Sequence, residues 1–340
     1  MRLTLPHLLR PTVVFFLGGC QIIADLTIPT YSGATSTAGA GGAGTGGATT
    51  STATTGSGGA LVTGQGGACT VSADPTIPPC LEHLQLWLVG DREDLVTKDG
   101  QGVVTEWRDA SSFGWTATAP AGTVTWVEKA NGQHAVHIAH GGMKLDPHAR
   151  ALALDEVGVF GAFNAATFPP PAGDDQAHFP FGASDLLCLR TSYAAASLEA
   201  SATTGQGTLG TRFSMVVSDG SQSNRMNVQN KGLSLDMWGI YGAGYACDAS
   251  CASGMMNVQR FGFADGDSYI PDDPVVVSLD PGAFPSWNGA WDRATVGSFC
   301  DDPSKGQIDA DVGELLLYDV FFDEAMRGKV QQYLVKRWVH

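Results

Sequence analysis

The chain has 340 residues, a formal net charge of −15 at pH 7, 43% hydrophobic residues and 44 glycines. This length is enough for one large domain or two small ones with a substantial buried core. No cluster of Lys and Arg is visible, which argues against a nucleic-acid partner because phosphate binding depends on such clusters. The simplest interpretation of the acidity is solubility.

The N-terminus has the pattern of an export signal. Arg2 and Arg10 precede a short apolar run at residues 11–17, and small residues follow it. Residues 17–20 read Leu-Gly-Gly-Cys and resemble the lipobox that bacterial lipoprotein signal peptidases prefer. By this likeness Cys20 becomes the acylated first residue of the mature protein. The alternative is an ordinary secretory signal that contains a cysteine by chance.

Attachment to a membrane would therefore depend on lipid. The apolar run is too short to span a bilayer as a helix. Gln21, rather than Asp, follows the cysteine, which by analogy with Gram-negative lipoproteins favours the outer membrane.

A flexible tether is predicted next, over residues 21–68. From 32 to 60 every residue is Gly, Ala, Ser or Thr, so the segment has no large apolar side chain to bury. A random coil of this length reaches roughly 30 Å. The tether would hold a folded domain, predicted for residues 69–340, away from the membrane surface.

The cysteines after Cys20 are even in number, which in an exported protein favours disulfides. Closeness and elimination favour three pairs, although the sequence permits other pairings. These pairs are Cys69 with Cys80, Cys247 with Cys251, and Cys188 with Cys300. A metal site at Cys247 and Cys251 is the alternative, but no second pair accompanies them.

Short strand candidates separated by Gly, Pro, Asn and Asp fill the region from 84 to 279. They are residues 84–88, 103–107, 123–127, 134–138, 157–163, 186–191, 212–217, 256–263 and 275–279. Many strands and almost no helix indicate a sandwich or a barrel.

Asn288-Gly289 predicts a tight hairpin loop, because both central residues of a primed turn need positive φ. In that geometry Trp287 and Trp291 lie on opposite sides of the ribbon, one in the core and the other near the surface.

The C-terminus predicts a buried strand from about 311 to 320, followed by an amphipathic helix. Asp323 caps the helix, and Lys336 with Arg337 suit the negative end of its dipole. Met326, Val330, Leu334 and Trp338 form one stripe, with Tyr333 beside it. Gly328 lies within the helix and costs about 1 kcal/mol relative to Ala.

The two ends of this region resemble a known family. Residues 313–319 read Gly-Glu-Leu-Leu-Leu-Tyr-Asp and are followed by a turn and a closing helix. Near the start, residues 84–88 read Leu-Gln-Leu-Trp-Leu, residues 103–111 read Val-Val-Thr-Glu-Trp-Arg-Asp-Ala-Ser, and residues 134–138 read His-Ala-Val-His-Ile. These segments look like the ends of laminin-G-like domains, which belong to the concanavalin A-like lectin and glucanase jelly rolls.

The resemblance covers residues 84–145 and 275–340. It implies an all-β fold, a two-sheet antiparallel jelly-roll sandwich of the concanavalin A type with a short C-terminal helix. Members of this family bind glycans, bind proteins or serve as accessory modules, so the fold alone does not fix the function.

Three evenly spaced histidines, His134, His137 and His140, would share a ridge on a helix and suggest a metal site. Val136, Ile138 and the resemblance favour a strand instead, on which His137 points away from the other two. His134 and His140 then lie roughly 20 Å apart, so one ion cannot bind all three.

Acidic loops suggest Ca²⁺, which prefers hard oxygen ligands at short spacing. The candidates lie in one loop and are Asp265, Asp267, Asp272 and Asp273. Asp301-Asp302 lie in another loop. They form no EF-hand pattern, and a solvated loop is the simpler interpretation.

Hydrolytic chemistry lacks its expected motifs. Glycosidases of this fold place paired acidic residues along one strand, and no Glu-x-Asp-x-x-Glu arrangement is present. No Gly-x-Ser-x-Gly elbow or His-Glu-x-x-His helix occurs either. We therefore expect a binding or structural domain rather than an enzyme.

Aromatic residues among glycines at 237–245 predict a flexible loop that exposes rings to a sugar or a protein. The candidate ligand-binding residues are Trp238, Tyr241 and Tyr245, with Trp291 as a further member. The alternative is that these rings are buried at the edge of the sandwich.

The sequence thus predicts a surface lipoprotein with a lipid anchor, a tether and one sandwich domain for adhesion or carbohydrate binding. Its partner would be a glycan or a surface protein. The alternatives are a protein-interaction or structural module without glycan binding, and a divergent glycan-active hydrolase.

Overall fold

Strand β20 (Asp309–Tyr318) contributes side chains to two separate apolar clusters. Leu315 and Leu317 belong to a cluster with members from two sheets, which we call the inner core. Leu316 and Tyr318 belong to a cluster shared with the C-terminal helix, which we call the outer core. Successive side chains of a strand point to opposite faces, so one continuous apolar run can fill two layers.

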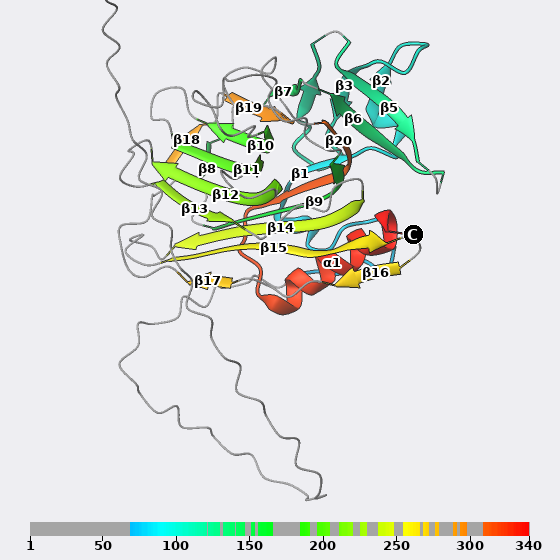
Figure 1. Ribbon diagram of the computed structural model, residues 1–340. Helices are drawn as coiled ribbons and strands as arrows, with labels where there is room; N and C mark the ends of the chain where they lie inside the picture. Colours follow the sequence, from blue (N-terminus) through cyan, green and yellow to red (C-terminus); the bar gives the residue numbers. More distant parts are fainter. Residues whose placement is uncertain are drawn as a thin grey trace, which may run out of the picture. The chain divides into compact units, whose positions relative to one another are not determined.

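The computed structural model describes much of the chain between Cys69 and Val339 (Figure 1). The described ranges are 69–120, 122–129, 132–139, 141–146, 151–153, 156–165, 184–190, 196–204, 211–219, 225–229, 237–247, 254–265, 268–271, 276–278, 288–290, 293–297 and 309–339. The predicted signal peptide, Cys20 and the tether lie outside these ranges, and these predictions stay open.

The first sheet has β20 near its middle, and all its described pairings are antiparallel. Its order is β16-β15-β14-β9-β20-β6-β5, with β1 also pairing β20 and β17 pairing β15. The bounds are β1 Leu84–Val89, β5 Val124–Glu128, β6 His134–Ala139, β9 Glu156–Ala165, β14 Trp238–Cys247, β15 Gly254–Asp265, β16 Ser268–Pro271 and β17 Val276–Ser278.

The second sheet packs its inner face against the first across the inner core. Its order is β13-β12-β11-β10-β19-β7-β4-β3-β2. The bounds are β2 Val96–Lys98, β3 Val104–Arg108, β4 Thr116–Thr118, β7 Met143–Asp146, β10 Ser184–Arg190, β11 Ala196–Thr204, β12 Thr211–Asp219, β13 Arg225–Gln229 and β19 Arg293–Val296. A short pair joins β8 (Ala151–Ala153) to β18 (Asn288–Ala290), and 3₁₀ turns occur at Leu81–His83 and Glu93–Leu95.

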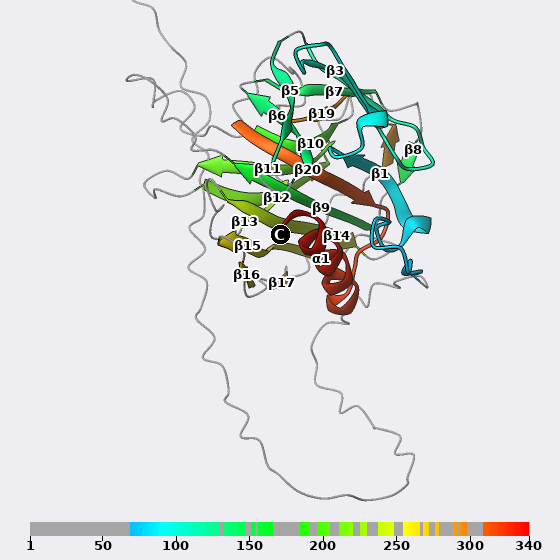
Figure 2. The same cartoon turned by 90° about the vertical axis from the view of Figure 1, so that its right-hand side faces the viewer.

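Helix α1 (Glu324–Trp338) forms a third layer on the outer face of the first sheet, beside β9 and β14 (Figure 2). Val330, Leu334 and Trp338 are buried in the outer core, as the predicted stripe requires. Asp323 caps the helix by accepting a hydrogen bond from the Met326 backbone N–H at 2.8 Å. The predicted antiparallel sandwich with a C-terminal helix is therefore confirmed. In the part of the chain that the structure describes, no helix has the length and apolar character to cross a membrane.

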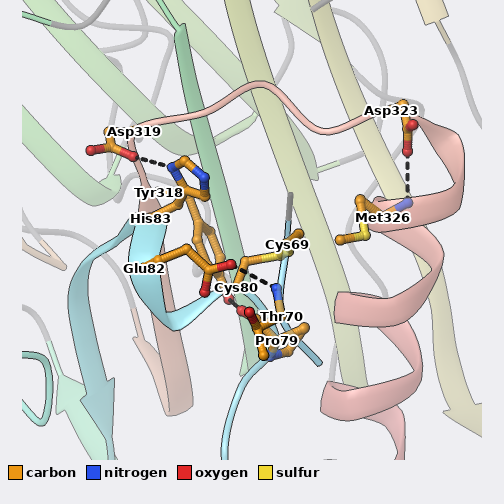
Figure 3. Close-up of a disulfide and its surroundings, with 10 residues drawn as sticks. All are labelled: Cys69, Thr70, Pro79, Cys80, Glu82, His83, Tyr318, Asp319, Asp323 and Met326. Atoms are coloured by element: carbon orange, nitrogen blue, oxygen red, sulfur yellow. Dashed lines mark hydrogen bonds and ion pairs between the residues drawn. A yellow bond between two sulfur atoms is a disulfide. The ribbon is translucent and has the colours of Figure 1, made fainter. Parts of the chain in front are cut away.

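The Cys69–Cys80 disulfide is confirmed, and it closes a loop against the outer core (Figure 3). Glu82 accepts a hydrogen bond from the Thr70 N–H at 2.6 Å, and the Tyr318 hydroxyl donates to the Pro79 carbonyl at 3.1 Å. The other predicted pairs involve Cys188, Cys247, Cys251 and Cys300, whose side chains lie outside the described part.

The strand candidates from 84 to 279 agree with described strands to within a few residues. The segment at 237–245 is an exception, because it is not a flexible loop but part of β14, paired with both β9 and β15. Its glycines serve close packing: a Cβ at Gly242 would come within 2.6 Å of the Phe261 ring and 2.7 Å of the Phe160 ring.

The hairpin predicted at Asn288-Gly289 is also wrong. Both residues lie within β18, where Asn288 pairs with Ala153 and Gly289 with Leu152. Glycine tolerates positive φ without requiring it, so pairing with a distant strand determines the conformation instead. Trp287 and Trp291 lie outside the described residues.

Alanine substitution of two glycines, one within α1 and one packed against its end, should change stability in opposite directions. A Cβ at Gly328 would meet nothing within 4 Å, whereas a Cβ at Gly313 would lie 2.5 Å from Cε3 of Trp338. Gly328→Ala should raise the free energy of unfolding by about 1 kcal/mol through helix propensity. Gly313→Ala should lower it by about 1–3 kcal/mol through overpacking. Urea denaturation of the oxidised protein measures both, and a Gly313→Ala protein as stable as the unsubstituted one would contradict this packing.

Candidate functional site

A buried carboxylate, that of Glu314, fixes the C-terminal end of α1 on the first sheet. Glu314 is fully buried and accepts hydrogen bonds from Trp87 Nε1 at 2.7 Å, the Tyr333 hydroxyl at 2.6 Å and Trp338 Nε1 at 2.8 Å. The Arg337 guanidinium lies 3.2 Å away. Burial raises the pKa of Glu314, while the charge of Arg337 and the hydrogen bonds oppose that rise. This network determines where the Trp338 ring lies.

Beyond Trp338 the outer face of the first sheet changes from apolar to polar. Backbone register aligns one residue from each of five adjacent strands: Asp311 pairs with His137 and Asn164, His137 with Thr125, and Asn164 with Trp238. We call this set the polar row. It consists of Thr125, His137, Asp311, Asn164 and Trp238.

The residues of the polar row share the outer face because their chain neighbours face inward. Val136, Ile138, Val312 and Phe163 all belong to the inner core. The five strands are spaced by about 4.8 Å, so the row is about 19 Å long. This length suits an extended ligand better than a single ion.

Charged groups at the centre of the row contact one another. His137 Nδ1 lies 2.9 Å from Asp311 Oδ1, and His137 Nε2 lies 3.7 Å from Asp309 Oδ1. Lys129, which follows β5, forms an ion pair with the other oxygen of Asp311. The His137 side chain is 32% exposed, and those of Asp311 and Lys129 are each 17% exposed. Solvent therefore reaches the cluster only partly.

The contact between Asp311 and His137 shifts the pKa of both side chains. The hydrogen bond to Asp311 raises the pKa of His137, and burial opposes this rise. Burial alone would raise the pKa of Asp311, but hydrogen bonds from His137 and Lys129 hold it below its usual range. The imidazolium and the carboxylate therefore stabilise each other.

Trp238 forms the aromatic end of the row. Its ring is half-buried and stacks on Trp338, with ring centroids 5.3 Å apart and an interplanar angle of 28°. The Lys129 ammonium lies 5.9 Å from the Trp238 ring centroid. The indole thus lies at the boundary between the outer core and the polar row.

The other predicted ligand-binding residues do not join Trp238. Tyr241 and Tyr245 point into the inner core and are 0% and 1% exposed, so they cannot contact a ligand at the surface. Their exposure was predicted from neighbouring glycines, but β14 is an interior strand of the sheet. Trp291 lies outside the described residues.

The calcium candidates stay untested. Asp267, Asp272 and Asp273 lie outside the described residues, and so does the side chain of Asp265 in β15. The single loop predicted for them is wrong, because β16 (Ser268–Pro271) pairs with β15 between Asp267 and Asp272. Within the described ranges, no group of three or more His, Cys, Asp or Glu side chains could hold a metal ion.

The predicted separation of the histidines is confirmed for two of them. His137 lies in the polar row, whereas His134 stacks on Trp126 with ring centroids 3.7 Å apart. Trp126 packs against the inner core, so the two histidines point to opposite faces of β6. His140 lies outside the described residues.

The polar row is not among the sites predicted from the sequence. Its signal is a polar residue at the alternate positions of otherwise apolar strands, as with His137 between Val136 and Ile138. Asp311 and Asn164 follow the same pattern in β20 and β9. Only the register between the strands, which the sequence does not give, brings them together.

No protein-family model and no curated protein matches this chain. Among solved structures, the binding domain of botulinum neurotoxin serotype G matches at 8% identity and a TM-score of 0.44, over 74% of this chain and 51% of that one. Trypanosoma rangeli sialidase in complex with 2,3-difluorosialic acid matches at 11% identity and 0.43, over 76% and 34%. The CBM40 of Ruminococcus gnavus IT-sialidase bound to α2,6-sialyllactose matches at 8% and 0.35, over 52% and 84%.

This chain therefore spans about half of the toxin domain and about a third of the Trypanosoma sialidase.

The coupling of His137 to Asp311 predicts a measurable change in pKa. Asp311→Asn should lower the pKa of His137 toward its ordinary value of 6.5, because the hydrogen-bonding carboxylate is lost. A titration of the imidazole by NMR measures this shift. Asp309→Asn is the matched control and should have a smaller effect, since Asp309 is 3.7 Å from the ring rather than 2.9 Å.

The same pair predicts how stability depends on pH. The raised pKa of His137 stabilises the fold below pH 6.5, an effect lost as pH rises through the folded-state pKa. The lowered pKa of Asp311 stabilises the fold above pH 3.8, an effect lost as pH falls. Asp311→Asn should therefore lower the free energy of unfolding most between pH 3.8 and pH 6.5. An equal loss of stability at pH 9 would contradict the coupling of Asp311 to His137.

Proposed function

We propose that this protein is a surface-anchored lipoprotein whose sandwich domain binds glycans through Trp238 and the polar row, without cleaving them. The observation that carries the proposal is a half-buried indole at the end of a row of hydrogen-bonding side chains. A sugar ring presents both apolar C–H faces and hydroxyl groups. An indole supplies apolar contact, and the polar groups fix orientation.

The N-terminal sequence supports the proposed display at the cell surface. Acylation of Cys20 in the lipobox would attach the protein to the membrane. Residues 21–68 would form the tether that holds the sandwich domain away from the membrane. The Cys69–Cys80 disulfide supports export, because such bonds persist in oxidising compartments. An anchored domain that binds glycans would serve adhesion.

The ionisation of the carboxyl groups supports binding rather than hydrolysis. A glycosidase needs a carboxylic acid with a raised pKa beside the scissile bond. Asp311 has a lowered pKa, so it stays ionised. Among the described carboxyl groups, burial raises the pKa of Asp109 and Glu314, but these are 7% and 0% exposed. Both are bonded to backbone or side-chain donors in the interior.

Glycan binding is tested with the full-length oxidised protein in detergent on a broad glycan array, with Ca²⁺ and again with EDTA. We expect saturable binding that Trp238→Ala weakens at least tenfold, about 1.4 kcal/mol. Loss of binding in EDTA would implicate the calcium candidates Asp265, Asp267, Asp272 and Asp273.

The matched control is Trp126→Phe. The Trp126 ring is already engaged within the protein, because it stacks on His134 with centroids 3.7 Å apart and Lys98 Nζ lies 4.1 Å from its centroid. This variant should bind as the unsubstituted protein does. Absence of binding to every glycan would overturn the proposal in favour of a protein-interaction module. Glycan turnover abolished by one carboxylate substitution would instead indicate a hydrolase.

Lipid attachment predicts that Cys20→Ser abolishes labelling with radioactive palmitate in cells. The unsubstituted protein should fractionate with the outer membrane, and the variant should leave it. Substitution of Cys69, whose sulfur is in a disulfide, is the control and should leave labelling intact. Equal labelling of the Cys20→Ser protein would exclude this anchor.

A further inference from the structure

We infer that the polar row accepts uncharged or cationic sugars, such as neutral hexoses or amino sugars, and rejects sugars that carry a carboxylate. This inference rests on the proposed glycan binding and specifies the chemical class of the ligand. It follows from the distribution of hydrogen-bond donors, acceptors and charges at the row.

The two cationic side chains at the row, Lys129 and His137, are already paired with carboxylates. Lys129 is paired with Asp311, and its side chain is 17% exposed. His137 is held between Asp311 at 2.9 Å and Asp309 at 3.7 Å. An anionic ligand would have to compete with these carboxylates for the same two cations.

Other nearby cations are engaged as well. Arg337, next to Trp338, lies 2.7 Å from Asp91 and 3.2 Å from the buried Glu314. Lys98 is paired with Glu93 at 2.7 Å and lies over Trp126. A carboxylate needs such a partner when it leaves water, because an unpaired ion is costly to desolvate. The described residues around the row offer none that is uncommitted.

The charged group that remains available at the row is an acceptor. Asp309 is 29% exposed, and its one described ionic contact is the 3.7 Å approach to His137. Its carboxylate oxygens therefore remain able to accept hydrogen bonds. A ligand hydroxyl or ammonium can donate to these oxygens, directly or through a water. A carboxylate cannot donate.

The overall charge of the protein also disfavours an anionic ligand. The chain carries a formal net charge of −15, so an approaching anion meets a repulsive field. Salt screens that field beyond about 8 Å at physiological ionic strength. The local carboxylate of Asp309 therefore matters more than the overall charge, and its removal should change the selectivity.

The experiment uses pairs of immobilised oligosaccharides that differ only in carboxylates. One set is sialylated glycans before and after methyl esterification of the sialic-acid carboxyl group, and the other is uronic-acid oligosaccharides before and after reduction of the carboxyl group. The full-length protein should bind the uncharged member of a pair at least tenfold more tightly than the acidic member. Equal or tighter binding of the acidic members would overturn the inference and leave the proposed glycan binding intact. Absence of binding to both members of every pair would overturn the proposed function itself.

The contribution of Asp309 to selectivity is tested by Asp309→Asn, which should reduce at least threefold the ratio of the affinity for the uncharged member to the affinity for the acidic member. Asp319→Asn is the matched control, because it changes the net charge equally at the other end of β20, where Asp319 contacts His83 and Gln85. It should leave the ratio unchanged. The ratio compares two ligands on one protein, so a modest loss of stability does not affect it. An unchanged ratio in Asp309→Asn would contradict the role of the Asp309 carboxylate in rejecting acidic sugars.

Discussion

The buried carboxylate of Glu314 is the interaction on which the arrangement of the outer layers depends. A carboxylate in a protein interior is costly unless its charge and its oxygens are satisfied. Here the hydrogen-bond donors come from Trp87 in β1 and from Tyr333 and Trp338 in the last turns of α1, and Arg337 adds a positive charge 3.2 Å away. The register of the helix on the sheet is therefore set by polar geometry, whereas its affinity for the sheet comes from the apolar outer core. Sliding the helix by one turn would leave Glu314 without these donors.

Close packing supports the same register. Gly313, next to Glu314, leaves room for the Trp338 ring, since any Cβ there would overlap it. Trp338 in turn stacks on Trp238 from β14. The disulfide-closed loop also reaches the helix, because Arg337 donates to the Thr76 carbonyl at 3.2 Å. The position of Trp238 at the polar row is thus a consequence of contacts that begin in the core.

The fold could be predicted from the sequence where local patterns suffice, and the site could not. Alternating apolar residues give β20, and Asp323 with the stripe ending at Trp338 gives α1. The strand β14 was missed because its glycines resemble loop glycines, although Gly242 is there to admit two phenylalanine rings. Of the predicted ligand-binding residues, Trp238 alone lies on the outer face among those that the structure describes. The partners of Trp238 in the row come from distant strands, so their proximity depends on register, which sequence periodicity does not give.

The end of the helix explains why a polar row exists on this sheet. An outer face covered by a helix must be apolar, as the outer core is beneath α1. The helix ends at Trp338, above Gly313, and the next outward residue of β20 is Asp311 rather than another leucine. From that point the face has no helical cover among the described residues, so ionisable side chains can keep contact with water and with one another. A sheet that changes from apolar to polar where its covering helix ends can offer both an indole edge and hydrogen-bonding groups. That combination is the one on which the inferred recognition of neutral sugars rests.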